Sequence, residues 1–227
     1  MEDAEGMLRE ELSPTGGYAQ ILAAIGRGRT RFSHIAGEVG QRIDHALDVL
    51  IKTGFVAKVV PVGAPRGARG SYEIPDPYLR FWFQVLYTEA ALIEGGQGVA
   101  VLERVLPRWQ THLGSVFEEQ ARAHARRLVR RGELPADLVI GRWWPARGGN
   151  VEVDVLGLRG SRTALIGEAR WQSSPLGTRD QETLRRKVPF VPNPVDEPTL
   201  VLWSRGGVAP EVHRAGALGF SINDVVT

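Results

Sequence analysis

Four residues in the second half of the chain have types and spacing that could support chemistry on a phosphate ester. Glu118 lies in a segment with helical spacing, and Asp154 and Glu168 lie in two successive apolar runs. Arg170 follows two positions after the last of these acids. Carboxylate oxygens are the ligands that Mg²⁺ prefers, and the bound ion activates water and neutralises charge during phosphodiester cleavage. We therefore take Asp154, Glu168 and Glu118 as candidate metal ligands, and these three with Arg170 as candidate catalytic residues.

The basic residue at position 170 resembles, but does not match, the last residue of a known pattern. Acids on two strands followed by a basic side chain resemble the PD-(D/E)xK type of metal-dependent phosphodiesterase, with Arg170 at the lysine position. Arginine stabilises negative charge, but its pKa is too high for it to accept a proton. Only three of the 28 basic residues are lysines, namely Lys52, Lys58 and Lys187. Arginine at this position therefore agrees with compositional drift, and the sequence leaves the activity of the site open.

The spacing of the two strand acids predicts how they pair. Side chains alternate between faces along a strand, so direct pairing of Asp154 with Glu168 puts both on one face of a hairpin. This register centres the turn at Ser161 and requires a loop of odd length. It also sets Glu152 opposite Arg170, so a plain cross-strand ion pair is the alternative. The intervening residues would then form the buried face: Val151, Val153 and Val155.

The elements that must position these residues follow from hydrophobic periodicity. The predicted order is helix, three strands, helix and strand, with a strand and a short helix at the end. The ranges are about 114–131, 138–144, 151–158, 163–171, 178–188, 199–203 and 217–226. This order predicts an α/β core.

The first half of the chain predicts a different module. Three short helices, at about 17–26, 30–39 and 41–53, precede strand-like segments at 55–60 and 71–74, which is the order of a winged helix. The basic loop between the strands would be the wing. We take Arg66 and Arg69 in this loop, with Arg42 beside the expected recognition helix, as candidate DNA contacts. Asp44 and Asp48 on that helix would repel phosphate, which favours contacts from the wing.

A helical connector is expected between the two modules. One helix should begin at Asp76 and run to about Glu94, and a second should cover 98–112, where Pro107 should kink or split it. The fold class is therefore α/β (α+β), with a mixed sheet in its restriction-endonuclease-like part. The predicted parts are a remnant helix, a winged helix-turn-helix, a connector and a nuclease-like domain, at 1–12, 13–75, 76–113 and 114–227.

Composition excludes several classes of site. The 227 residues include no Cys, which excludes disulfides and thiolate metal sites and favours a cytoplasmic location. No apolar run is long enough to span a bilayer. There is no G-x-x-x-x-G-K-[ST] motif, so we expect no ATP site in this chain. The net charge is only +2, but two mildly basic blocks at 13–75 and 114–227 permit contacts with nucleic acid.

Several short motifs together resemble one family. The segments at 72–83, 116–118, 141–144 and 167–171 resemble the C-terminal portion of archaeal and bacterial AAA/STAND-type ATPases, over residues 8–225. Members of that family carry a P-loop ATPase, a winged helix and a PD-(D/E)xK-like tail. The resemblance implies an ATPase domain or protein as a partner. It does not carry over ATP binding, because the residues that bind ATP are absent from this sequence.

These observations lead to one expected function and two alternatives. We expect a nucleic-acid-associated protein that acts on DNA as a Mg²⁺-dependent endonuclease. The first alternative is a catalytically inactive regulatory or docking module that works with an AAA/STAND ATPase. The second is a winged-helix transcription regulator that forms a homo-oligomer through its C-terminal domain. We expect no membrane partner and no role for the five scattered histidines.

Overall fold

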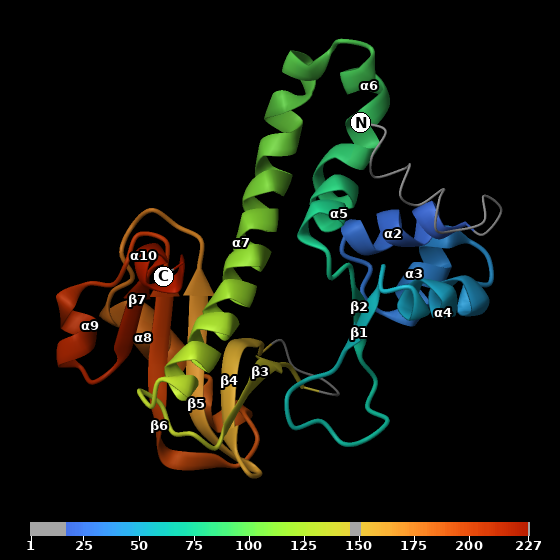
Figure 1. The fold of residues 1–227 in the computed structure, drawn as a ribbon. Helices are drawn as coiled ribbons and strands as arrows, with labels where there is room; N and C mark the ends of the chain where they lie inside the picture. Colours follow the sequence, from blue (N-terminus) through green and yellow to red (C-terminus); the bar gives the residue numbers. More distant parts are fainter. Residues whose placement is uncertain (1–16, 146–150, 227) are drawn as a thin grey trace. The chain divides into compact units, whose positions relative to one another are not determined.

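The computed structural model describes residues 17–145 and 151–226, and its fold is a mixture of helices and sheets, as predicted (Figure 1). Close contacts divide the chain into two compact units. The first unit contains the described residues up to 59 together with 70–112, and the second contains 60–69 and the described residues from 113 onward. The remnant helix predicted at 1–12 lies outside the described residues.

The first unit begins with three short helices and a hairpin. Helices α2 (Tyr18–Gly26), α3 (Phe32–Val39) and α4 (Asp44–Lys52) precede strands β1 (Ala57–Val59) and β2 (Ser71–Glu73), which pair in antiparallel fashion. The element order agrees with the predicted winged helix. Five consecutive residues of α2, from 21 to 25, are buried, so this helix forms the centre of the unit's core.

The predicted helix from 77 to 94 is helical throughout but changes type. Helix α5 (Pro77–Phe81) passes into a π-helix, η1 (Trp82–Leu86), and then into a 3₁₀ turn, η2 (Tyr87–Glu89), and α6 (Ala90–Glu94). The Asp76 side chain caps the first turn, since it accepts a hydrogen bond from the amide of residue 79 at 2.8 Å. Two consecutive aromatic residues of η1, Trp82 and Phe83, are both buried.

The two helices predicted at 98–112 and 114–131 form one continuous helix. Helix α7 (Gly98–Arg130) contains Pro107 without ending there, so the predicted break between 112 and 114 is wrong. A glycine such as Gly114 costs about 1 kcal/mol in a helix interior, which the neighbouring helix formers offset. The compact units still divide within this helix, between His112 and Leu113.

The second unit is built on a five-stranded sheet. The strands are β3 (Leu138–Trp143), β4 (Val153–Arg159), β5 (Arg162–Arg170), β6 (Pro194–Ser204) and β7 (Leu218–Ser221), and they lie in chain order across the sheet. The first three form antiparallel neighbours, whereas β5, β6 and β7 are parallel. The sheet is therefore mixed, as predicted, and the carboxyl ends of its parallel strands lie at one edge.

Helices cover both faces of this sheet (Figure 1). The second half of α7 and the terminal helix α10 (Ile222–Val226) pack on one face, where Phe117, Ala121 and Ala125 are buried. Helices α8 (Thr178–Arg185) and α9 (Pro210–Arg214) pack on the other face. Residues of the strands thus enter two separate cores, one on each face of the sheet.

Candidate active site

The β4–β5 hairpin has the predicted register but not the predicted turn. Val155 lies opposite Gly167, and continuing this register by one residue sets Asp154 opposite Glu168. The turn is a two-residue connection, because Arg159 pairs with Arg162, and the odd residue is a bulge at Ala164 within β5. The predicted odd-length loop is therefore wrong. Gly160, with φ of 59°, fits the tight turn, and the bulge absorbs the extra residue.

A second bulge lies at Asp154 itself. Gly141 of β3 pairs with Leu156 and Trp143 pairs with Val153, so two residues of β4 face the single residue 142. A bulge interrupts alternation and re-aims a side chain. As a result, Val153 is buried in the core under α8 and Val155 in the core under α7. The predicted single buried face of residues 151, 153 and 155 is wrong for this reason.

Asp154 turns toward the strand that carries the second acid. Its Oδ2 accepts a hydrogen bond from the backbone amide of Ala169 at 3.0 Å, directly after Glu168. Burial raises the pKa of Asp154, and the negative charge of Glu168 raises it further. On the other side, Arg122 of α7 donates to the carbonyl oxygen of Asp154 at 3.0 Å. The two strand acids are therefore close enough to repel each other.

Glu118 approaches the same carboxylates from α7. Burial raises its pKa to about 7, and the charge of Asp154, and more weakly that of Glu168, adds to the shift. Arg142 and Arg122 act in the opposite direction. A carboxyl group with neighbouring negative charges holds its proton to a higher pH. The three carboxylates predicted from the sequence thus influence one another in the structure, although they come from three separate elements.

Glu168 is held by two cations, and one of them was not predicted. Lys187, two residues beyond the end of α8, places its Nζ 2.6 Å from Glu168 Oε2 and 2.8 Å from the carbonyl oxygen of Glu152. Arg170 forms an ion pair with the other carboxylate oxygen, Oε1. Both the Glu168 and Lys187 side chains are largely buried, at 10% and 21% exposure, whereas Arg170 is 54% exposed. The site therefore contains a lysine, supplied from the turn after α8 and not from the strand.

The alternative ion pair between Glu152 and Arg170 is not the one that forms. Glu152 pairs instead with Arg142 of β3, at 3.1 Å, while Arg170 pairs with Glu168. The bulge explains the exchange, since it turns the end of β4 toward β3. Arg142 also stacks over Trp144, with 5.4 Å from its guanidinium carbon to the ring centroid.

The arrangement was tested against the needs of a divalent cation. The three candidate ligands offer hard oxygen atoms, as Mg²⁺ requires. Their carboxylates repel one another, and a bound cation would relieve this repulsion. As placed, however, no three His, Cys, Asp or Glu side chains of the described residues form a group able to hold one ion. Asp154 and Glu168 use their oxygens for the amide of Ala169, Lys187 and Arg170. The donor chemistry fits a metal, provided that these carboxylates exchange partners.

Three arginines of α7 bind main-chain oxygens around the sheet. Arg126 donates to the carbonyl oxygen of Ile140 at 3.2 Å, and Arg127 donates to that of Val225. The third is Arg122, through its contact with the Asp154 carbonyl. Arg122 compensates a carbonyl at the bulge, where the strand ladder is interrupted.

The candidate DNA contacts are all exposed. Arg66 and Arg69 lie in the loop 60–69, which belongs to the second compact unit and is tied to it by a 2.9 Å hydrogen bond from the Val62 amide to the Arg142 carbonyl. This main-chain hydrogen bond joins the loop to β3. Arg42 is 95% exposed and lies 3.7 Å from Asp44, so its charge is partly compensated.

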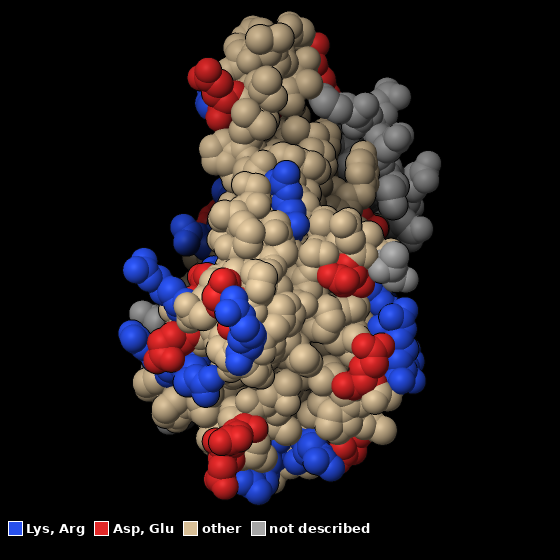
Figure 2. Space-filling model, turned by 90° about the vertical axis from the view of Figure 1, so that its left-hand side faces the viewer, with Lys and Arg blue, Asp and Glu red and all other residues tan. Residues whose placement is uncertain are grey.

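One face of the second unit carries charges of both signs. On the face that Figure 2 shows, basic and acidic side chains lie next to one another over this unit. Such a surface offers individual cationic contacts and not one uniform basic field.

Within the described part of the chain, no helix is long and apolar enough to cross a membrane.

Comparison with known proteins gives one family and one relative. Residues 82–184 match the profile of a family described as archaea bacterial proteins of unknown function. The match includes Glu118, Asp154, Glu168 and Arg170 and ends three residues before Lys187. Over 190 residues the chain is 27% identical to an uncharacterized protein of Methanocaldococcus jannaschii. The matched region covers 81% of this chain and 42% of the relative. The chain thus spans less than half the length of this relative. No solved structure matches it.

Proposed function

We propose that the second unit is a metal-dependent phosphodiesterase of the PD-(D/E)xK type that acts on DNA, with Lys187 in the role of the pattern's lysine. The observation that carries the proposal is the pair of bonds from Lys187 and Arg170 to Glu168, next to Asp154. Beside this ion pair, burial and neighbouring negative charge raise the pKa values of Asp154 and Glu118, and perturbed pKa values cluster at functional sites.

Each residue has a definite task in this proposal. Asp154, Glu168 and Glu118 would hold Mg²⁺, which would activate water and neutralise charge on the phosphate. Lys187 is a compact point charge with three donors, suited to orient water or a phosphate oxygen beside Glu168. Arg170 is more exposed and would stabilise negative charge on the substrate. Arg122 fixes the main chain at Asp154 and thereby its position.

One alternative is favoured by a specific observation. Two cations that bind one carboxylate also form a structural ion-pair network. Such networks perturb the pKa values of neighbouring groups without any role in catalysis. In that case the unit would be a regulatory or docking module. The resemblance to AAA/STAND ATPases would then suggest an ATPase as its partner, and the greater length of the archaeal relative is compatible with further domains in related proteins.

The first unit supports a second part of the proposal. Its helix–helix–helix–hairpin order suits a winged helix that brings DNA to the protein, and the exposed wing arginines supply phosphate contacts. We place the protein in the cytoplasm, because it has no cysteine to stabilise it by disulfides.

A cleavage assay tests the proposal. Purified protein is incubated with linear duplex, branched and single-stranded DNA in Mg²⁺ or Mn²⁺, with EDTA as the matched control. We expect metal-dependent strand cleavage of at least one form, and none in EDTA. Absence of cleavage with both metals and all three substrates would leave the docking module as the better account.

A further inference from the structure

A second cationic feature lies at the carboxyl ends of β5 and β6. The guanidinium carbon of Arg205 lies 5.1 Å from the ring centroid of Trp171, so the two side chains stack. Arg205 is exposed, and no carboxylate among residues 17–145 and 151–226 forms an ion pair with it. Stacking on an aromatic ring leaves the in-plane N–H groups of a guanidinium free to donate. Arg205 is thus an oriented cation that has no anionic partner within the described ranges.

The main chain fixes the position of this arginine. The amide of Arg205 donates to the Arg170 carbonyl at 3.2 Å, and the amide of Gly206 donates to the Gln172 carbonyl at 2.9 Å. The pairing of β5 with β6 therefore continues beyond the strand ends. A side chain at position 206 would bring its Cβ to 2.1 Å from the carbonyl oxygen of Ser173, so glycine permits this close approach. Arg205 is consequently held in place by the backbone and by Trp171.

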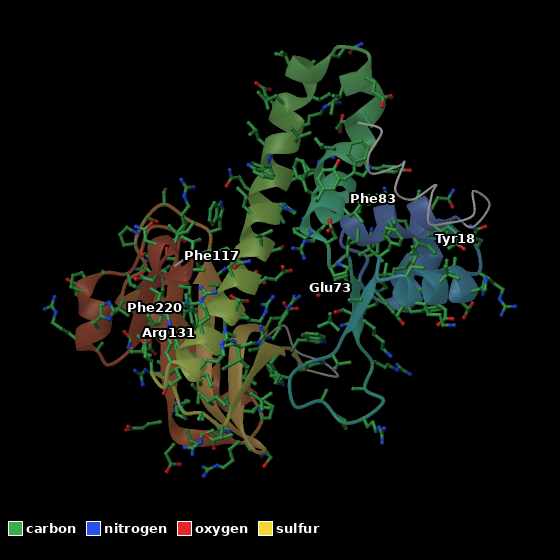
Figure 3. All side chains as sticks on the ribbon, in the orientation of Figure 1. Tyr18, Glu73, Phe83, Phe117, Arg131 and Phe220 are labelled. Atoms are coloured by element: carbon green, nitrogen blue, oxygen red, sulfur yellow. The ribbon has the colours of Figure 1, made fainter. Side chains whose placement is uncertain are left out.

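The Trp171 ring lies beside segments that carry two residues of the candidate active site. On α7, the Phe117 ring lies 5.6 Å from that of Trp171, and Figure 3 shows Phe117 near the sheet. Phe117 directly precedes Glu118, and Trp171 directly follows Arg170. The indole nitrogen of Trp171 is buried and has no hydrogen-bond partner. The contacts of Trp171 with Arg205 and Phe117 are therefore made by the ring.

We infer that Arg205, supported by Trp171, contacts a backbone phosphate of the nucleic-acid strand that enters the candidate active site. The inference rests on the proposed function for its substrate. Ligands of open α/β sheets bind in the crevice outside the carboxyl ends of the strands, where Arg205 lies. Guanidinium groups bind phosphate through paired hydrogen bonds, and Arg170 adds a second exposed cation one position away along the paired strand ends.

Binding of labelled single-stranded and duplex DNA, measured by fluorescence anisotropy at several salt concentrations in EDTA, tests the inference. We expect Arg205→Ala to weaken binding roughly tenfold and to lower the salt slope by about 1, as for one lost phosphate contact. Arg205→Lys keeps the charge but loses the planar stack and should be intermediate. Trp171→Phe should bind better than Trp171→Leu. The matched control is Arg214→Ala on α9, where the arginine is 74% exposed and pairs with Glu211.

Each outcome decides the inference. Wild-type affinity in Arg205→Ala, an equal loss in Arg214→Ala, or no binding of nucleic acid by the wild type would overturn it. Failure of the proposed function has a different signature. A wild type that binds but never cleaves, together with a specific loss in Arg205→Ala, would remove the enzyme and leave the phosphate contact. The single arginine variants keep the buried core intact, and circular dichroism verifies their folding.

Discussion

The Nζ of Lys187 lies 2.6 Å from Oε2 of Glu168, although the two residues are 19 positions apart in the sequence. Glu168 also binds Arg170, so this carboxylate joins a largely buried lysine to an exposed arginine. In the proposed phosphodiesterase site, Lys187 and Arg170 are therefore the two candidates for the role of the pattern's lysine. The difference in burial favours Lys187, because charge–charge interactions are stronger away from water.

Replacing Lys187 and Arg170 one at a time should reveal which of the two side chains supports cleavage. We expect Lys187→Met to lower single-turnover cleavage at saturating DNA by about 100-fold, the typical effect of losing one charge-stabilising donor. Arg170→Ala should cost less, and Arg170→Lys should keep or raise the rate. The control is Lys52→Met, since Lys52 forms only a surface pair with Asp48. Equal rates for Lys187→Met and Lys52→Met would exclude Lys187 from the chemistry.

The raised pKa of Glu118 makes folding stability depend on pH. In the folded state the pKa of Glu118 is about 7, so the carboxyl group keeps its proton up to about that pH. In the unfolded state it loses the proton near pH 4.5. Between these values the native state binds more protons, so stability falls as pH rises through this window. Glu118→Gln should remove the fall and be more stable at pH 8, by about 2–3 kcal/mol at most. Urea unfolding at pH 4 and 8 measures this, and an equal effect at both values would contradict it.

His124 should give the opposite dependence. Trp203 donates its indole N–H to His124 Nδ1 at 3.0 Å, so this nitrogen must be unprotonated. Burial, and then the charge of Arg127, lowers the pKa of His124 below its usual 6.5. The unfolded chain therefore takes up the proton first, and stability present above pH 6.5 is lost as pH falls below it. His124→Asn should flatten this acid loss in unfolding curves, whereas the exposed His45→Asn should leave it unchanged.

The loop 60–69 supplies a test of the DNA-binding proposal. Changing both Arg66 and Arg69 to Ala should weaken binding uniformly across DNA sequences and lower the salt slope by about 2, because phosphate contacts carry no sequence information. Arg42→Ala, which removes a charge already close to Asp44, serves as the comparison. Unchanged affinity and slope in the double variant would indicate that the loop contacts protein and not DNA.

The sequence predicts the order of elements and the pairing of Asp154 with Glu168, because apolar spacing and strand register are local properties. It did not predict the bulges at Ala164 and at Asp154, since a bulge changes the register by one residue without a distinctive residue type. The continuity of α7 through Pro107 was also missed, because the cost of one proline is offset over a long helix.

Lys187 shows a different limit. Its distance in sequence from Glu168 hides a contact that only the packing of α8 on the sheet creates. The scarcity of lysine in the chain was the one signal that could have drawn attention to it. The sequence placed the three acids in separate elements but could not show which cations would neutralise them.

Cleavage by the Asp154→Asn variant, with DNA affinity measured on the same samples, tests the central claim most directly. Asparagine keeps an oxygen for the hydrogen bond from the Ala169 amide, so the fold is preserved while a charged metal ligand is lost. The account predicts that wild-type protein cleaves DNA in Mg²⁺ or Mn²⁺, and that Asp154→Asn binds DNA with nearly unchanged affinity but does not cleave it. Metal-dependent cleavage by Asp154→Asn at the wild-type rate would contradict the proposed site.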